Sequence, residues 1–134
     1  MKTARDPRHL KRIKIMQDLF AWDFNSKQDQ LPTTAQKITQ HVDEIDRMIA
    51  EAAPTWPIDK INKIDLATLR LAVFELVVAP KLTGFEGDLP KDAPVKVVVD
   101  EAVEIGKEFG SDSSASFING VLGKLISLQN IPVS

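Results

Sequence analysis

The chain has 134 residues, of which 43% are apolar, so it is long enough for one domain with a hydrophobic core. It contains no cysteine, which excludes disulfides, thiolate metal sites and cysteine nucleophiles and agrees with a reducing compartment. No apolar run reaches the ~18 residues of a membrane span, and the N-terminus lacks the apolar stretch of a signal peptide. These properties predict a soluble cytoplasmic protein that does not enter a membrane.

Positive charge is concentrated at the N-terminal end of the chain. Residues 1–14 carry six lysine and arginine side chains against one aspartate, a local charge of +5. The other 120 residues carry 11 basic and 18 acidic side chains, a charge of −7, so the overall charge of −2 hides this separation. The N-terminal segment is therefore the expected attachment site for an anionic partner.

The first predicted element is a helix that begins at Pro7, a residue suited to the first turn, and ends at about Phe24. Its apolar residues recur at spacings of three and four, which predicts one packed face: Leu10, Ile13, Met16, Phe20 and Phe24. A basic stripe is expected beside that face, because residues 5, 8 and 12 fall within about 60° of one another on a helical wheel.

The next predicted helix begins at Thr33, where Thr33 and Gln36 have the spacing of a capping box, and ends at about Ala52. Its expected packed face has five members: Ile38, Val42, Ile45, Met48 and Ile49. A short segment over 58–63 follows. Asp65 is the expected cap of the helix after it.

The most apolar part of the chain is the segment 66–79, in which Arg70 and Glu75 are the only charged residues. A helix that is apolar nearly all round belongs at the centre of a bundle. Arg70 and Glu75 are then expected to be buried or half-buried as a polar pair. The connection 80–94 contains two glycines and three prolines and is the expected seam between two sub-bundles.

Two further helices are predicted after this connection. The β-branched run 95–99 would suit a strand by itself, but apolar residues continue at helical spacing to Phe109, which favours a helix over 95–109. Gly110 is expected to end it in the left-handed conformation. Asp112 or Ser113 is the expected cap of the last helix, which places Phe117, Val121, Leu125 and Leu128 on one face. Three glycines in these helices suggest close helix approach or room for a partner: Gly106, Gly120 and Gly123.

These elements predict an all-α fold with six or seven helices and no sheet. The whole chain, 1–134, is expected to be one domain, built from an N-terminal sub-bundle over about 1–79 and a C-terminal sub-bundle over about 94–134.

Candidate catalytic groups are scarce. His41 and Glu44 have a spacing that helical metal ligands use, but no second such pair exists, and a solvated face explains them better. The serine run 111–116 is better explained by a helix cap than by a nucleophile. Phosphate loops, dinucleotide fingerprints and serine elbows are absent from the sequence, so we expect no catalytic residue, no metal and no cofactor.

Three stretches of the sequence resemble the NusB family of bacterial transcription antitermination factors. They are WPIDKINKIDLATLRLAVFEL over 56–76, VKVVVDEAVEIGKEFGSDSSASFINGVLGKL over 95–125 and, more weakly, QDLFAW over 17–22. The resemblance implies an all-helical, non-enzymatic protein that binds boxA-type single-stranded RNA of ribosomal RNA transcripts. It also implies that the protein acts with the ribosomal protein NusE and joins the elongating RNA polymerase. Some members of this family are dimers, so a homodimer stays open.

The resemblance also implies where RNA binds. The N-terminal basic helix corresponds to Arg8 and Arg12, with Lys2, Arg5 and Lys11 as neighbours, although the adjacent arginines usual in the family are interrupted here by His9 and Leu10. A second contact region corresponds to four residues: Glu75, Asp112, Ser113 and Phe117. Phe117 has two interpretations, a platform for an unpaired base or ordinary core packing with Val121 and Leu125.

Two other functions compete with this one. A similar helical module precedes the catalytic domain of certain ribosomal RNA cytosine methyltransferases, which makes an accessory RNA-binding module the first alternative. The second is a protein-interaction or dimerisation module in which residues 1–14 only solubilise the chain.

Overall fold

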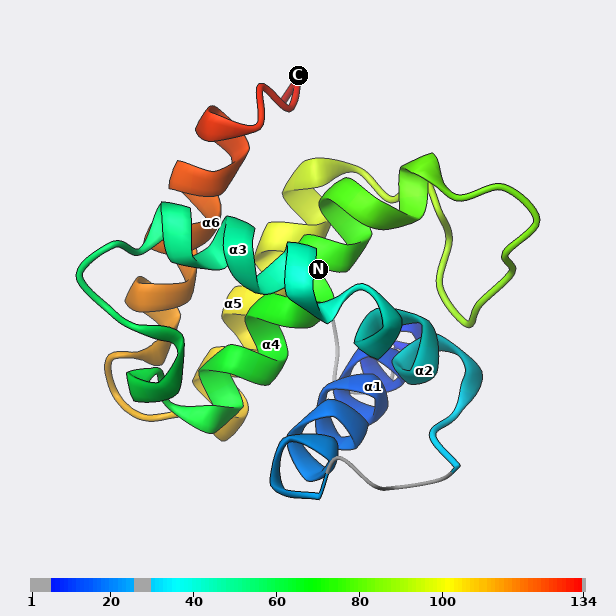
Figure 1. The fold of residues 1–134 in the computed structure, drawn as a ribbon, viewed down its shortest axis with the longest axis horizontal. Coiled ribbons are helices and arrows are strands. Elements are labelled where there is room, and N and C mark those ends of the chain that lie inside the picture. The colour runs from blue at the N-terminus through cyan, green and yellow to red at the C-terminus, as the bar shows by residue number, and fades with distance from the viewer. Residues whose placement is uncertain (1–5, 26–29, 134) are drawn as a thin grey trace.

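The computed structural model describes residues 6–25 and 30–133, and within these ranges all regular structure is helical (Figure 1). The six α-helices are α1 (Pro7–Phe24), α2 (Thr33–Gln40), α3 (Val42–Ala52), α4 (Lys63–Val73), α5 (Val95–Phe109) and α6 (Ser114–Leu128). Short turns of other helix types cover Ile58–Lys60, Phe74–Val78 and Ala79–Lys81. The all-α prediction with six or seven helices is confirmed, and no described helix is long and apolar enough to cross a membrane.

The predicted bounds of α1 and α5 agree with the structure, whereas the second helix is divided. α1 begins after Asp6, whose carboxylate accepts a hydrogen bond from the Arg8 backbone N–H at 2.9 Å and caps the helix. The predicted helix 33–52 is interrupted at His41, which separates α2 from α3. The capping box at Thr33 is wrong, because Pro32 precedes α2 and the structure shows no side-chain cap there.

Helix α4 starts two residues before the predicted cap. Asn62 caps it by accepting hydrogen bonds from the backbone N–H groups of Ile64 and Asp65, at 2.8 and 3.3 Å. Asp65 is therefore inside the first turn and buried. After Val73 the helix widens into one π-helical turn over Phe74–Val78. Such turns occur often at functional positions, and this one carries Glu75.

Gly110, between α5 and α6, is required because a side chain at this position would clash with its neighbours, not because of its backbone conformation. Gly110 has φ −93° and ψ −162°, so the left-handed ending predicted for it is wrong. A Cβ atom there would lie 2.3 Å from Ser114 Oγ and 2.8 Å from the Gly106 carbonyl oxygen. Gly106 itself lies against Ile118 of α6, as close packing requires, whereas a Cβ at Gly120 or Gly123 would meet no described atom within 4 Å.

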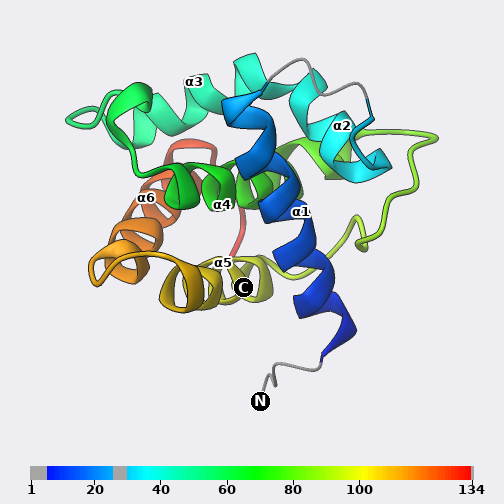
Figure 2. The ribbon, with the colours of Figure 1, turned by 90° about the horizontal axis from the view of Figure 1, so that it is seen from below.

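Helix α4 lies at the centre of the molecule, as its composition predicts. It contacts α1, α3, α5 and α6, and Figure 2 shows it between α3 on one side and α5 on the other. All of its residues from Asp65 to Val73 are buried. The α3 helix also packs directly on α6, across the predicted seam, and the division into two sub-bundles stays a prediction.

The face of α1 that packs on α4 differs from the face that the apolar spacing predicts. Its buried residues are His9, Arg12, Ile15, Met16 and Leu19. Two members of the predicted face, Leu10 and Phe24, are instead 50% and 66% exposed. The helix is thus turned so that a histidine and an arginine face the interior.

Candidate nucleic-acid interface

The exposed basic side chains at the start of α1 are Arg8 and Lys11. The side chain of Arg8 is 66% exposed and lies 3.6 Å from the Asp6 carboxylate, an exposed ion pair that solvent weakens. One turn further along, Lys14 is paired with Asp18. Lys2 and Arg5, which the sequence assigns to the same cluster, lie outside the described residues. Within the described part, the exposed basic side chains of α1 are therefore Arg8, Lys11 and Lys14, of which Arg8 and Lys11 lie nearest the start of the helix.

Arg12 is not part of this surface, which corrects the predicted stripe. Its side chain is only 3% exposed and binds Glu75 through two hydrogen bonds: Nε donates to Oε2 at 2.9 Å, and Nη2 donates to Oε1 at 2.8 Å. Nη1 also donates to Glu101 at 3.4 Å. Both oxygens of Glu75 face a guanidinium group and away from solvent. Arg12 and Glu75 thus hold α1 to the π-helical turn that follows α4 through a bidentate ion pair.

Arg70 and Glu75 are buried as predicted, but they are not partners of each other. Arg70 donates two hydrogen bonds to Asp46, at 2.9 and 2.8 Å, and a third to Asp23 at 3.2 Å. Arg70 therefore contacts α3 and the end of α1, whereas Glu75 contacts Arg12 near the start of α1.

His9 extends the buried network to α5. Its Nδ1 lies 3.1 Å from Glu101 Oε1 and its Nε2 lies 2.8 Å from Glu108 Oε1. Burial alone would lower the pKa of His9, but the hydrogen bonds to Glu108 and Glu101 outweigh it and raise the pKa above its ordinary value. A protonated imidazole can donate to both carboxylates at once. His9 thereby places the first turn of α1 beside the last turn of α5.

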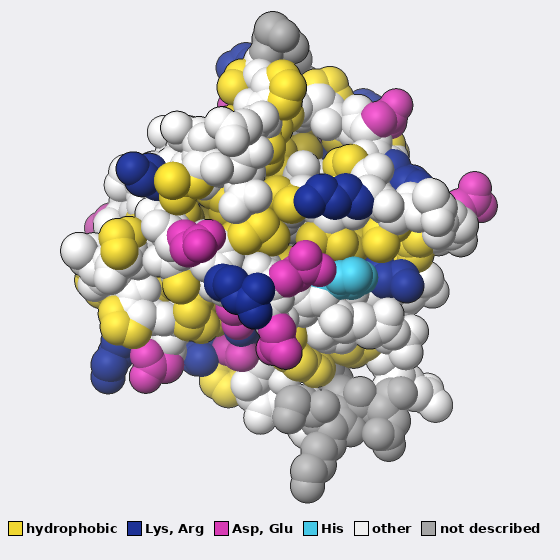
Figure 3. Space-filling model, turned by 45° about the horizontal axis from the view of Figure 1, so that its top comes forward, with side chains coloured by type: hydrophobic (Ala, Val, Ile, Leu, Met, Phe, Trp, Pro, Cys, Tyr) yellow, Lys and Arg dark blue, Asp and Glu magenta, His cyan; other side chains and the backbone are white. Residues whose placement is uncertain are grey.

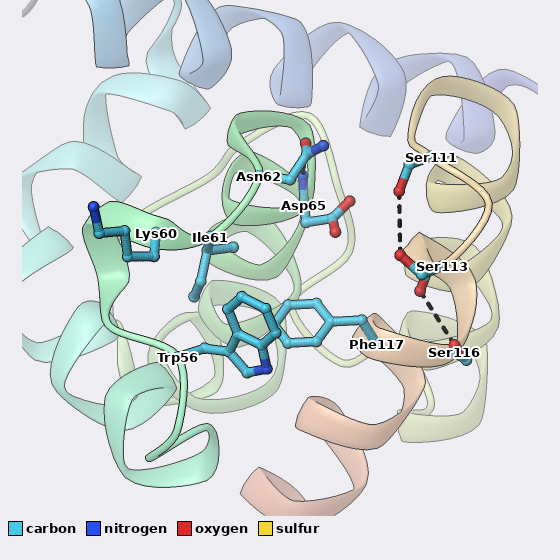
Figure 4. Close-up of a pocket in the computed structure, with 9 residues that line it drawn as sticks. All are labelled: Trp56, Lys60, Ile61, Asn62, Asp65, Ser111, Ser113, Ser116 and Phe117. Carbon is cyan, nitrogen blue, oxygen red and sulfur yellow. Dashed lines mark hydrogen bonds between the residues drawn. The ribbon is translucent and has the colours of Figure 1, made fainter.

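The loop after α5 leads from this contact into an open pocket (Figure 4). The pocket has a volume of about 410 Å³ and lies between the segment that follows α3, the start of α4 and the start of α6. The rings of Trp56 and Phe117 form its apolar wall, with centroids 6.1 Å apart in an edge-to-face arrangement. Ser113 lies on the opposite rim, where its carbonyl oxygen accepts a hydrogen bond from the Ser116 hydroxyl at 3.2 Å.

The predicted second contact region divides between two places. Ser113 and Phe117 line this pocket, Asp112 is exposed in the loop beside it, and Glu75 is buried with Arg12. Ser113 precedes α6, but neither it nor Asp112 makes the predicted side-chain cap. Instead the Ser114 hydroxyl accepts a hydrogen bond from the Ser111 N–H at 2.9 Å and so closes the loop. Phe117 is half-buried, so one part of its ring packs against the core and another part is accessible to a base.

Four residues of this region are not predicted from the sequence: His9, Glu101, Trp56 and Asp65. His9 and Arg12 are three residues apart, and Glu101 and Glu108 are seven apart on another helix, so both pairs follow helical spacing. This spacing could have indicated that the two pairs face each other. Using it would have required the assumption that charged side chains point into the interior, which is uncommon.

Elsewhere the surface carries mixed charge. On the face shown in Figure 3, dark blue basic side chains are interspersed with magenta carboxylates, and the described atoms of that face form no continuous basic area. His41 and Glu44 make an ordinary contact at 2.7 Å on the surface of the molecule. Among the described residues, no group of three or more histidine, aspartate or glutamate side chains is arranged to hold a metal ion.

Known proteins resemble this chain in sequence and in structure. The family model described as the NusB family matches residues 9–127. The transcription antitermination protein NusB of Roseiflexus castenholzii is 33% identical over 139 aligned positions, which cover 90% of this chain and 92% of that protein. The protein of the same name from Chloroflexus aggregans is 45% identical over 87 positions, 65% of this chain but only about half (52%) of the relative.

Solved structures of NusB proteins are similar to this chain in fold. T. maritima NusB superposes with a TM-score of 0.72 at 27% identity and covers 95% of this chain and 93% of its own. A structure of the antitermination factors NusB and NusE in complex with dsRNA superposes at 0.69 with 20% identity, which supports the fold. The curated relatives are named as antitermination proteins, in line with the expectation that this protein is not an enzyme. From the length of the family match and the identity with the Roseiflexus protein, the chain belongs to the NusB family.

Proposed function

We propose that this chain is a transcription antitermination factor of the cytoplasm. It binds boxA-type single-stranded RNA together with NusE and joins the elongating RNA polymerase. The family assignment supports this role, and the observation that carries the RNA-binding part is the arrangement of α1. Two buried basic residues, His9 and Arg12, fix the helix to the body through Glu75, Glu101 and Glu108, while Arg8 and Lys11 are exposed to solvent.

The exposed cations are assigned to phosphate groups. Arg8 and Lys11 lie one turn apart on α1, so both can contact the backbone of one RNA strand. Lys2 and Arg5 precede them in the chain and are assigned the same role. Because acidic side chains predominate in the rest of the chain, RNA has a preferred approach at this end of the molecule.

The loop and pocket beside α1 are assigned to bases and sugars. Phe117 and Ser113 line the pocket, and Asp112 can accept hydrogen bonds from base or ribose donors but would repel phosphate. Arg12 and Glu75 satisfy each other and are assigned a positioning role: they keep α1 in register with this loop. RNA thus follows a path from the start of α1 to the start of α6.

The proposal is tested by measuring RNA affinity as a function of salt for the Arg8→Ala/Lys11→Ala double variant. Two lost phosphate contacts should reduce the slope of log affinity against log salt by about 1.4, since a single strand gives about 0.7 per contact. In about 0.1 M salt this amounts to about 2 kcal/mol, a loss of roughly 25-fold. Filter binding with a boxA-type RNA, with and without NusE, provides the measurement.

The matched control is Lys81→Ala/Lys96→Ala, which removes two exposed cations from other parts of the surface. It should change both the affinity and the slope much less. If the two double variants behave alike, the assignment of phosphate contacts to α1 is refuted. If the wild-type protein does not bind boxA-type RNA even with NusE, the proposed function itself is refuted.

A further inference from the structure

The pocket beside Phe117 contains a buried acidic group that the RNA-binding residues assigned above do not include. Asp65, in the first turn of α4, lines the pocket and is 4% exposed. In Figure 4 its carboxylate points across the hollow toward the serines of the loop that precedes α6. Its Oδ1 atom is buried and has no hydrogen-bond partner among the described residues. A buried acceptor without a partner costs free energy, and a bound ligand would supply that partner.

The remaining lining defines the shape and chemistry of such a ligand. Trp56 and Phe117 offer aromatic surface, and Trp56 is 51% exposed, so a flat ring can reach it from solvent. Lys60 brings a cation to the rim, and Ser113 and Ser116 add hydroxyl groups. An aromatic wall, a hydrogen-bond acceptor at depth and a cation at the mouth match a nucleotide, with its base inside and its phosphate outside.

We propose that this pocket binds one unpaired RNA base that carries an exocyclic amino group, with Asp65 as the acceptor and Trp56 as a stacking surface. The inference rests on the proposed function and adds base preference to it. Adenine, cytosine and guanine each present an amino group that can donate to Oδ1. Uracil presents its one ring N–H between two carbonyl oxygens, and these oxygens would repel the carboxylate because both are hydrogen-bond acceptors.

The position of the pocket favours RNA over a protein side chain as its occupant. His9 and Glu108 bring the start of α1 beside the end of α5, and the loop 110–113 runs from that point to the pocket rim. A strand that contacts Arg8 and Lys11 can therefore continue into the pocket. A protein arginine or lysine would instead meet the like charge of Lys60 at the entrance. Burial raises the pKa of the Asp65 carboxyl, with a partial opposing effect of the Ser114 hydroxyl, so a donor that pairs with the carboxylate relieves this cost.

The first experiment compares three single-stranded RNAs of about 12 nucleotides, within the usual site size, composed only of A, only of C or only of U. The full chain should bind the A and C strands about tenfold more tightly than the U strand, the effect of one hydrogen bond to a charged group. Asp65→Asn adds an amide donor that pairs with a uracil carbonyl, so the preference should narrow or reverse while the salt dependence from α1 is kept. A purely structural role of Asp65 would not produce this change.

The second experiment locates the base by fluorescence. Binding of the A strand should quench Trp56, so the quenching should persist in Trp22→Phe and disappear in Trp56→Phe. Trp56→Ala, a substitution of an exposed residue, should also remove the preference for A and C, and it serves if Asp65→Asn does not fold.

The outcomes separate this inference from the proposed function. If all three strands bind with an affinity that depends on Arg8 and Lys11, but Trp56 is not quenched and Asp65→Asn leaves the preference unchanged, the pocket assignment alone is overturned. If NusE without RNA quenches Trp56 and the three strands bind equally, the occupant is a protein side chain and the inference is also overturned. If no strand and no boxA-type RNA binds, the proposed function fails as well.

Discussion

Replacing Arg12 with methionine removes a cation from the contact between α1 and the π-helical turn that follows α4, but keeps much of the side-chain volume. In the wild-type protein the Arg12 guanidinium satisfies both oxygens of Glu75, at 2.9 and 2.8 Å, and reaches Glu101 at 3.4 Å. All three side chains are at most 5% exposed. After the substitution the Glu75 carboxylate stays buried without its cation. The variant therefore measures the cost of an uncompensated buried charge.

The expected loss is large relative to the stability of a small domain. Removing one partner of a buried ion pair costs about 3–5 kcal/mol, whereas the whole free energy of unfolding of such a domain is about 5–15 kcal/mol. Replacing both partners with apolar residues avoids the uncompensated charge. The double variant Arg12→Met/Glu75→Met should therefore recover about 2 kcal/mol or more of the loss.

Urea unfolding at neutral pH, followed by circular dichroism, measures these differences. Arg8→Met is the matched control, because Arg8 lies one turn away on the same helix with an exposed side chain. It should change the free energy of unfolding by less than about 0.5 kcal/mol. The reasoning is refuted if Arg12→Met costs no more than Arg8→Met, or if the losses of Arg12→Met and Glu75→Met simply add in the double variant.

Two further predictions concern His9 and the glycines around α6. The pKa of His9 is raised in the folded protein, so its contribution to stability is complete below the pKa of the unfolded chain and is lost as pH rises through the folded pKa. The stability difference between wild type and His9→Gln should therefore shrink between about pH 6 and pH 9 in urea unfolding, and a constant difference would contradict this. Gly110→Ala should cost about 1–3 kcal/mol, because its Cβ would lie 2.3 Å from Ser114 Oγ. Gly120→Ala, which meets open space within its helix, should stabilise the protein by about 0.5–1 kcal/mol, and equal effects of the two substitutions in the same assay would show that crowding does not explain Gly110.

Local sequence signals were sufficient for much of the helical architecture. The bounds of α1 and α5 follow from Pro7, from the spacing of apolar residues and from the glycine after Phe109. The central place of α4 follows from its nearly continuous apolar composition. These properties depend on residues within a few turns of one another, which is why they can be read from sequence.

Capping was less predictable than helix position. Thr33 and Asp65 have side chains that favour caps, but Pro32 and Asn62 occupy the positions that precede their helices. Of the two caps predicted for the last helix, Ser113 does occupy the cap position, but its side chain makes no cap hydrogen bond. Several residues with cap-forming side chains lie within a few positions of each helix start. Packing of the following helix decides which of them sits at the boundary.

The rotation of α1 and the role of Arg12 depend on contacts between residues far apart in the chain. Apolar spacing alone places Leu10 inside and Arg12 outside, but Arg12 pairs with Glu75, 63 residues away, and His9 with Glu101, 92 residues away. A charged side chain is buried where the fold brings it an opposite charge, and no local periodicity contains that information. That α1 is a basic helix follows from its local sequence, whereas Glu75 and the carboxylates of α5 select which of its basic side chains are buried and which stay exposed.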